Sequence, residues 1–151
     1  MGDSLNPALL GRIGTRSTPQ TELVTRRDIR KYAIATRQRL PKYLAGDEAP
    51  PLFHVALFWP VLPVEQLAPD GVAVDSMFPP VENRRPMAGG LKIDYHRPIR
   101  PGDVLTATRT LANIHEKQGS SGTLVFIEVL MQVVNAAGAP VLTETTTRIM
   151  R

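Results

Sequence analysis

Among the side chains that can transfer a proton, His54 has the surroundings best suited to catalysis. Two carboxylates, Asp47 and Glu48, precede it within seven residues. A histidine oriented by a carboxylate is a common general base in enzymes, so His54 and Asp47 are the candidate catalytic residues. A buried histidine in a core or a subunit interface fits the same pattern. The other histidines, His96 and His115, lack the spacing of metal ligands, and we expect no metal site.

A second group of polar side chains follows the paired glycine Gly89-Gly90. From Leu91 onwards apolar and polar residues alternate, and the run ends at two prolines and a glycine. This pattern predicts a strand that leaves a glycine bend and ends at a turn. Four basic or potentially basic side chains lie along it, which on charge alone fits a solvated strand end: Lys92, His96, Arg97 and Arg100.

Composition limits the class of protein. The chain has 151 residues, a net charge of +4 and no cysteine, which predicts one domain, excludes disulfides and a cysteine nucleophile, and is compatible with the cytoplasm. No apolar run is long enough for a membrane span, and the N-terminus is not a secretory signal. No nucleic-acid-binding motif accompanies the positive charge, so an acidic partner or a phosphorylated ligand is the expected counterpart.

The first elements of the chain are predicted from local signals. Residues 1–19 are polar, and we expect them to be flexible or peripheral. A β-prone segment at 20–25 leads into a helix from Arg26 to about Arg39, begun by a capping box between Thr25 and Asp28. The residues at helical spacing that should face the core are Ile29, Tyr32, Ala33 and Thr36, and the opposite, basic face should be solvated.

A short second helix is predicted at 49–60. Pro50 and Pro51 suit its first turn, and the residues that follow are apolar on nearly every side except at His54, so the helix should be buried. Trp59 should lie in the core or in a dimer interface. The connection at 61–86 is long and irregular, as functional or partly disordered loops are.

The rest of the chain reads as strands, in which Thr123–Asn135 is apolar on both faces and should be central. A curved antiparallel sheet wrapped around a buried central helix is an α+β hot-dog fold, and we predict a single such domain over 1–151. The four strands expected after the irregular connection, with a turn at 117–122 between the second and third, are Leu91–Pro98, Val104–Ile114, Thr123–Asn135 and Val141–Met150.

The chain resembles the MaoC-like hydratases and dehydratases over about residues 20–151, and most of all the N-terminal half of mesaconyl-CoA and itaconyl-CoA hydratases. The segments that carry this resemblance are Ala49–His54, Asn83–Gly90, Tyr95–Asp103 and Glu116–Phe126. The resemblance implies a hot-dog fold, a thioester of CoA or of acyl carrier protein as the ligand, no other cofactor, and reversible addition of water to a 2-enoyl thioester. In the family an Asp and a His activate the water, and an amide hydrogen at the start of the central helix polarises the thioester carbonyl.

One departure from the family concerns the catalytic signature Asp-x-Asn-Pro-x-His, which should precede the central helix. This chain has Arg37–Glu48 there instead. In two-domain members the N-terminal half lacks the signature, and this chain ends where such a half would end. We therefore expect a non-catalytic subunit that pairs with a hot-dog subunit bearing the signature. The alternatives are a homomeric hydratase that uses His54 with Asp47 or Glu48, a non-enzymatic acyl-CoA-binding or scaffolding protein and, less favoured, a thioesterase.

The resemblance also implies where a substrate would bind. The glycine pair would line an acyl tunnel, although a bulge in a curved strand explains the pair equally well. The two arginines after it would hold CoA phosphates, although a surface or interface role fits them too. The expected substrate-binding residues are Pro51, His54, Met87, Gly89, Gly90, Tyr95, Arg97 and Arg100.

Overall fold

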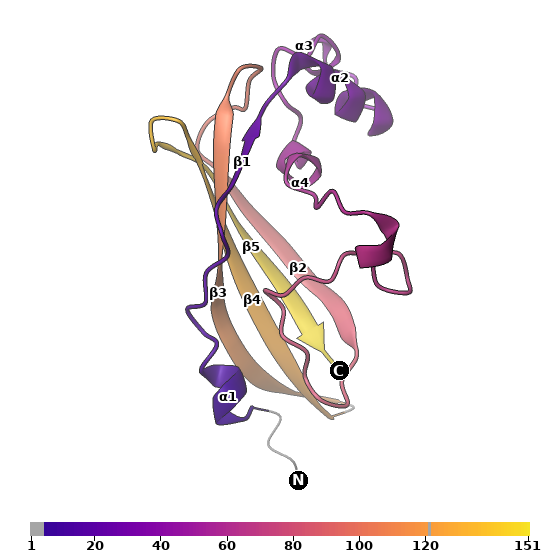
Figure 1. The fold of residues 1–151 in the computed structure, drawn as a ribbon, viewed down its shortest axis with the longest axis vertical. Helices are drawn as coiled ribbons and strands as arrows, with labels where there is room; N and C mark the ends of the chain where they lie inside the picture. The colour runs from indigo at the N-terminus through magenta and orange to yellow at the C-terminus, as the bar shows by residue number, and fades with distance from the viewer. Residues whose placement is uncertain (1–4, 121) are drawn as a thin grey trace.

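The computed structural model describes residues 5–120 and 122–151. Their main feature is one curved, antiparallel five-stranded sheet with the strand order β1-β3-β4-β5-β2 (Figure 1). Alternation of apolar and polar residues sets the register, because it directs every second side chain to the same face. The strands are β1 (Gln20–Leu23), β2 (Pro86–Tyr95), β3 (Val104–Gly119), β4 (Gly122–Asn135) and β5 (Pro140–Met150).

The connectivity confirms the predicted central strand and adds one crossover. Strand β4 lies between β3 and β5, and its inward-facing Val125, Ile127 and Val129 are almost completely buried. Strand β2 does not pair with β3, the next strand in the chain, but lies at the far edge of the sheet and pairs with β5. Strand β2 begins five residues earlier than predicted, and β3 continues into the predicted turn at 117–122, of which Ser121 lies outside the described residues.

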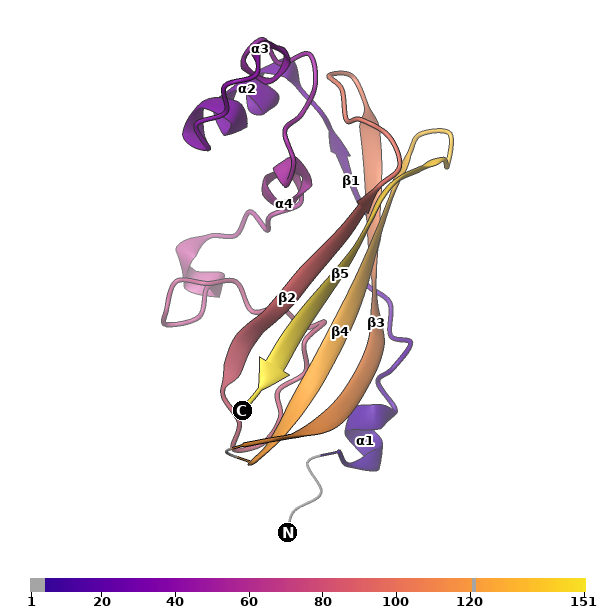
Figure 2. The same ribbon diagram turned by 180° about the vertical axis from the view of Figure 1, so that it is seen from behind.

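The helices are short and lie on one side of the sheet, apart from the first, which lies beside the lower end of β3 (Figure 1). Figure 2 shows the opposite face, which none of the described helices crosses. Among the described residues, no helix is long and apolar enough to cross a bilayer. The helices are α1 (Pro7–Leu10), α2 (Arg26–Ala35), α3 (Pro41–Leu44), α4 (Phe53–Leu57) and the 3-10 turn η1 (Val64–Gln66).

Helix α2 begins as predicted and ends early. The Asp28 N–H donates to Thr25 Oγ1 at 3.0 Å, and the Thr25 hydroxyl donates back to the Asp28 carboxylate at 2.6 Å. This reciprocal cap satisfies one of the free amide groups of the first turn. The helix stops at Ala35 instead of continuing to about Arg39, because Arg37 has a left-handed backbone with φ 55°.

Helix α4 occupies the place of the central helix but differs from the prediction in two ways. It starts only at Phe53, because Leu52 has φ 66°, so the two prolines lie before the helix and not in its first turn. It is also buried on one side only: Phe53 and His54 are buried against the sheet, whereas Trp59, just past the helix, is 57% exposed. The sheet therefore covers this helix without enclosing it, and Trp59 is not part of the core of this chain.

Two hydrophobic clusters cover the inner face of the sheet. The upper cluster joins α2 and α4 to the strands through Ile29, Phe53 and Leu105. The lower cluster joins α1 and the segment at 77–81 to β3 and β4 through Leu9, Phe78 and Ile127. Residues 5–19 run along β3 at the edge of the molecule, where the Ser17 N–H donates to the carbonyl of Arg109 at 2.9 Å.

Candidate functional site

A buried hydrogen-bonded pair of side chains joins helix α4 to strand β5 between the two hydrophobic clusters. His54 is 0% exposed and Glu144 is 6% exposed, and His54 Nε2 lies 2.6 Å from Glu144 Oε2. The other carboxylate oxygen of Glu144 accepts a hydrogen bond from the Thr146 hydroxyl at 2.8 Å. His54 Nδ1 is buried and has no hydrogen-bond partner among the described residues. The arrangement is that of a histidine oriented by a carboxylate.

The charge of Glu144 follows from its surroundings. Burial alone would raise the pKa of this carboxyl, but the hydrogen bonds from His54 and Thr146 and the nearby positive groups outweigh burial and leave the pKa below its usual value. Glu144 is therefore ionised at neutral pH and accepts a hydrogen bond from His54 Nε2–H.

The carboxylate that faces His54 is thus not one of the two that precede it in the sequence. Asp47 pairs with Arg26 on the surface, and Glu48 pairs with Lys42 at 2.6 Å. The expectation that Asp47 or Glu48 orients His54 is wrong, because the turn before α4 directs both side chains to nearby cations. A signal for Glu144 did exist in the sequence: Glu144, Thr146 and Arg148 are polar residues on the β5 face that also carries apolar side chains.

The start of helix α4 is fixed by Tyr95 of strand β2. The Leu52 N–H donates to the Tyr95 hydroxyl at 3.0 Å, and the Tyr95 ring meets the His54 ring edge-on at 6.2 Å between centroids. The Phe53 ring packs in the same way against Tyr32 of α2 at 5.7 Å. The Leu52 amide, which lies at the helix N-terminus, therefore already has a partner within the chain.

His54 lines two cavities. The outer cavity, of about 380 Å³, also involves Pro51, Tyr95 and Arg97. The inner cavity, of about 420 Å³, lies over the sheet and is lined by Glu144, Arg148 and a set of apolar side chains that includes Val55, Phe58, Trp59, Met77 and Met131. His54 thus lies between the outer and the inner cavity, and Glu144 lines the inner one.

The structure brings together half of the expected substrate-binding residues. Pro51, His54, Tyr95 and Arg97 all line the outer cavity. The remaining four line neither cavity: Met87, Gly89 and Gly90 lie near the other end of β2, and Arg100 lies in the turn after it, where its N–H donates to the Asp103 carboxylate at 2.8 Å.

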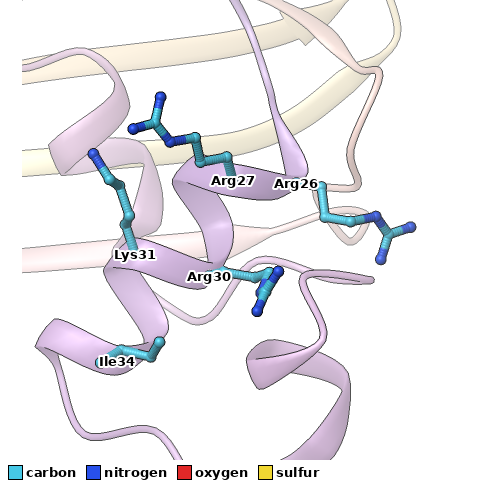
Figure 3. A pocket seen from close by; sticks show the side chains of 5 residues that line it. All are labelled: Arg26, Arg27, Arg30, Lys31 and Ile34. Atoms are coloured by element: carbon cyan, nitrogen blue, oxygen red, sulfur yellow. The ribbon is translucent and has the colours of Figure 1, made fainter.

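The basic face of α2 forms a separate surface, with a hollow of about 440 Å³ lined by Arg26, Arg27, Arg30, Lys31 and Ile34. Arg27 and Lys31 extend from one side of the helix and Arg26 and Arg30 from the other (Figure 3). Ile34, which follows them on the helix, is 65% exposed. This surface shares no lining residue with either cavity at His54.

The segment before helix α4 lacks the signature Asp-x-Asn-Pro-x-His. Residues 37–48, which precede the helix, contain neither asparagine nor histidine. His54 lies within α4 itself, and its carboxylate partner Glu144 comes from β5.

The comparison with known families identifies the class of protein. A family model described as the FAS1-like dehydratase domain region matches residues 12–144. The chain belongs to this family, and its resemblance to the MaoC-like hydratases and dehydratases is confirmed.

Two relatives and one solved structure show which known proteins the chain is similar to. The chain is 37% identical to mesaconyl-C(4)-CoA hydratase of Chloroflexus aurantiacus over 90 residues, which cover 59% of this chain and 32% of that protein. It is 28% identical to the UPF0336 protein SCO4636 of Streptomyces coelicolor, over 98% of this chain and 96% of that one. A chain in the crystal structure of the ChsH1-ChsH2 complex from Mycobacterium tuberculosis superimposes with a TM-score of 0.66 at 16% identity, covering 89% of this chain and 83% of that chain. The hot-dog fold is thereby confirmed.

Proposed function

We propose that this chain is the acyl-thioester-binding, non-catalytic subunit of a 2-enoyl-CoA hydratase or 3-hydroxyacyl thioester dehydratase. A second hot-dog subunit that carries the Asp-x-Asn-Pro-x-His signature supplies the catalytic pair. The observation that carries the proposal is the segment at 37–48, which precedes α4 and contains neither the asparagine nor the histidine of the signature. Without that histidine, general acid–base catalysis by the family's pair cannot take place in this chain.

Two further features support a binding role. The Leu52 amide at the start of α4 already donates to Tyr95, so it is not available to polarise a thioester carbonyl. The outer cavity with Arg97 at its rim suits the phosphopantetheine part of the ligand, and the inner cavity over the sheet suits the acyl group. The half-exposed α4 gives the catalytic subunit an apolar surface against which to pack.

A homomeric hydratase is the second candidate, and the His54–Glu144 pair favours it. In that case His54 would be the general base, and Glu144, in place of Asp47 or Glu48, would orient it. Binding of an acyl-CoA without any chemistry is the third possibility.

Hydration of crotonyl-CoA, followed at the absorbance of the enoyl thioester, distinguishes these functions. We expect the pure chain to be inactive and a co-purified complex with a signature-bearing hot-dog protein from a neighbouring gene to be active. Full activity of the pure chain, lost in His54→Ala, would establish the homomeric enzyme instead. Absence of acyl-CoA binding both alone and in the complex would leave only a scaffolding role.

A further inference from the structure

The Tyr95 hydroxyl holds the turn that precedes helix α4. The Phe53 N–H donates to the Pro50 carbonyl at 3.2 Å, and Leu52 between them has φ 66° and ψ 2°. This is the backbone conformation of the third residue of a type II turn, where glycine or asparagine is usual and a leucine is strained. The Leu52 N–H donates to Tyr95 Oη at 3.0 Å. The hydrogen bond to Tyr95 therefore stabilises a turn that carries strain, as turns at ligand-binding sites often do.

The same hydroxyl has a proton left to donate. A tyrosine hydroxyl combines one donor with two acceptor lone pairs, and the Leu52 N–H uses only one lone pair. In the parts of the chain that the structure describes, no acceptor receives the Tyr95 O–H. The side chain is 47% exposed and lines the outer cavity. Because a hydroxyl that accepts a hydrogen bond becomes a stronger donor, the outer cavity contains an oriented and unused hydrogen-bond donor.

A second tyrosine at the same turn offers no such donor. The Tyr32 hydroxyl donates to the Pro51 carbonyl at 3.4 Å, so its proton is already used within the chain. Tyr32 lines neither of the cavities at His54, and its ring packs on Phe53 of α4. Both tyrosines thus stabilise the start of α4, and of the two only Tyr95 presents a free O–H to a ligand.

The position of Tyr95 beside His54 indicates which part of a ligand the hydroxyl meets. The proposed function puts the pantetheine part in the outer cavity and the acyl group in the inner one. Among the described residues, His54 alone lines both cavities, so the thioester that joins these two parts lies beside it. The Tyr95 ring meets the His54 ring edge-on at 6.2 Å between centroids. The thioester is therefore the part of the ligand within reach of the Tyr95 hydroxyl.

We propose that the Tyr95 hydroxyl donates a hydrogen bond to the carbonyl oxygen of the bound acyl thioester. The inference rests on the proposed acyl-thioester function and names the side chain and the ligand atom that meet. In the family an amide hydrogen at the start of the central helix polarises this carbonyl. Here the amide at the start of α4, that of Leu52, donates to Tyr95, and the tyrosine passes the hydrogen bond on to the ligand. A side-chain hydroxyl from β2 thus takes the place of a backbone amide.

The charges in the outer cavity separate this role from phosphate binding. Tyr95 is a neutral donor, which suits a neutral carbonyl oxygen. Arg97 lines the same cavity two residues further along the chain, and its guanidinium suits a phosphate. With Tyr95 beside His54 and Arg97 beyond it, the two donors follow one another in the order in which the thioester and the phosphates follow one another in an acyl-CoA.

The test compares butyryl-CoA with S-butyl-CoA, a thioether that lacks only the carbonyl oxygen. Neither ligand has a double bond that can be hydrated. With the full chain in isothermal titration calorimetry, we expect butyryl-CoA to bind about three- to tenfold more tightly, as one hydrogen bond allows. Tyr95→Phe should abolish this preference and leave the affinity for S-butyl-CoA within about twofold of the wild type. Tyr32→Phe, the matched tyrosine outside both cavities, should keep the preference.

A second measurement reports on the hydrogen bond itself, because Tyr95→Phe also frees the Leu52 amide. A fluorotyrosine introduced at position 95 has nearly the same shape and a more acidic hydroxyl, which makes it a stronger donor. The infrared band of butyryl-CoA labelled with carbon-13 at its carbonyl should lie at a lower wavenumber in the fluorotyrosine protein than in the wild type. A fluorotyrosine at position 32 should leave the band unchanged.

Each outcome bears on one claim. If the wild type binds butyryl-CoA no more tightly than S-butyl-CoA, or if the band does not respond to fluorotyrosine at position 95, the carbonyl inference fails while acyl-thioester binding stands. A preference that survives in Tyr95→Phe together with an unmoved band overturns it as well. If the wild type binds neither ligand, alone or with its catalytic subunit, the proposed function fails too. Should Tyr95→Phe not fold, the wild-type preference and the fluorotyrosine band still decide.

Discussion

His54 and Glu144 join two segments that are 90 residues apart in the sequence. At the scale of single residues, this contact explains how a carboxylate remains charged where burial alone would favour its protonated form. The same contact accounts for the position of α4, because the hydrogen bond holds the first turn of the helix against β5. In a binding subunit such a pair is a structural anchor, whereas in an enzyme it is a catalytic dyad. Different variants test these two roles.

Glu144→Gln tests the charge of this pair. The substitution keeps the shape of the side chain and removes its charge, and the free energy of unfolding should fall by about 1–3 kcal/mol at pH 7. Because the pKa of Glu144 is lowered in the folded state, its stabilising contribution is present above the usual glutamate pKa and disappears as the pH falls through the folded value. Urea unfolding from pH 7 to pH 3 should therefore show the wild type approaching the variant.

The control for this prediction is Glu82→Gln, which changes an exposed carboxylate. Its free energy of unfolding should follow the wild type within about 0.5 kcal/mol at each pH. A difference between wild type and Glu144→Gln that stays constant down to pH 3 would show that the charge of Glu144 does not contribute.

At the scale of elements, local signals predicted the strands and the start of α2. The start of α4 and the partner of His54 depend on tertiary contacts, and local signals did not predict them. The capping box at Thr25 and the two-faced apolar pattern of β4 are properties of neighbouring residues, so they are readable from the sequence. The start of α4 depends on a left-handed Leu52 whose amide is held by Tyr95 from another strand. The partner of His54 is a residue on β5, and spacing along the chain does not contain that information.

The two glycines of the pair in β2 differ in whether the fold requires a residue without a side chain. The β2–β5 register shifts between Ala88 and Gly90, which marks a bulge at Gly89. A Cβ atom on Gly89 would lie 2.9 Å from Ile149 Cγ1 and 2.9 Å from the backbone oxygen of Thr147. Nothing lies within 4 Å of the corresponding position on Gly90.

We therefore expect Gly89→Ala to destabilise the fold by about 1–3 kcal/mol and Gly90→Ala to change stability by less than about 0.5 kcal/mol. Thermal unfolding of the two variants side by side provides the measurement, since each serves as the control for the other. Equal losses of stability would mean that the bulge is not what requires glycine. A selective loss of acyl-CoA affinity in Gly90→Ala would instead support the glycine-lined acyl tunnel that the family resemblance implies.

At the scale of the whole molecule, the sheet leaves one side of α4 uncovered. Val55 is 37% exposed and Trp59 is 57% exposed. A central helix covered on one side by its own sheet leaves room for a second subunit on the other, as the proposed function requires. Apolar side chains of this size on one surface are typical of protein interfaces.

Trp59 reports on this assembly because it is the only tryptophan of the chain. Addition of a tryptophan-free variant of the catalytic subunit should shift its fluorescence emission to shorter wavelength, as burial in an apolar interface does. Trp59→Ser should weaken the complex at least about tenfold in sedimentation or calorimetry, whereas Ile34→Ser on the exposed face of α2 should not. An unchanged emission spectrum in a complex that demonstrably forms would exclude α4 from the interface.

The separation of the two hydrophobic clusters also has a consequence for how the molecule opens. The segment at 77–81 contributes Met77, Phe78 and Val81 to the lower cluster and no residue to the upper one. We expect this segment to leave the sheet by local unfolding, at a lower free energy than the whole domain, while the upper cluster stays packed. Amides in this segment should exchange with deuterium well before those of β4, and a ligand that bridges both halves should slow the exchange in the segment alone. Access to the inner cavity would then be controlled by the stability of one short segment of chain.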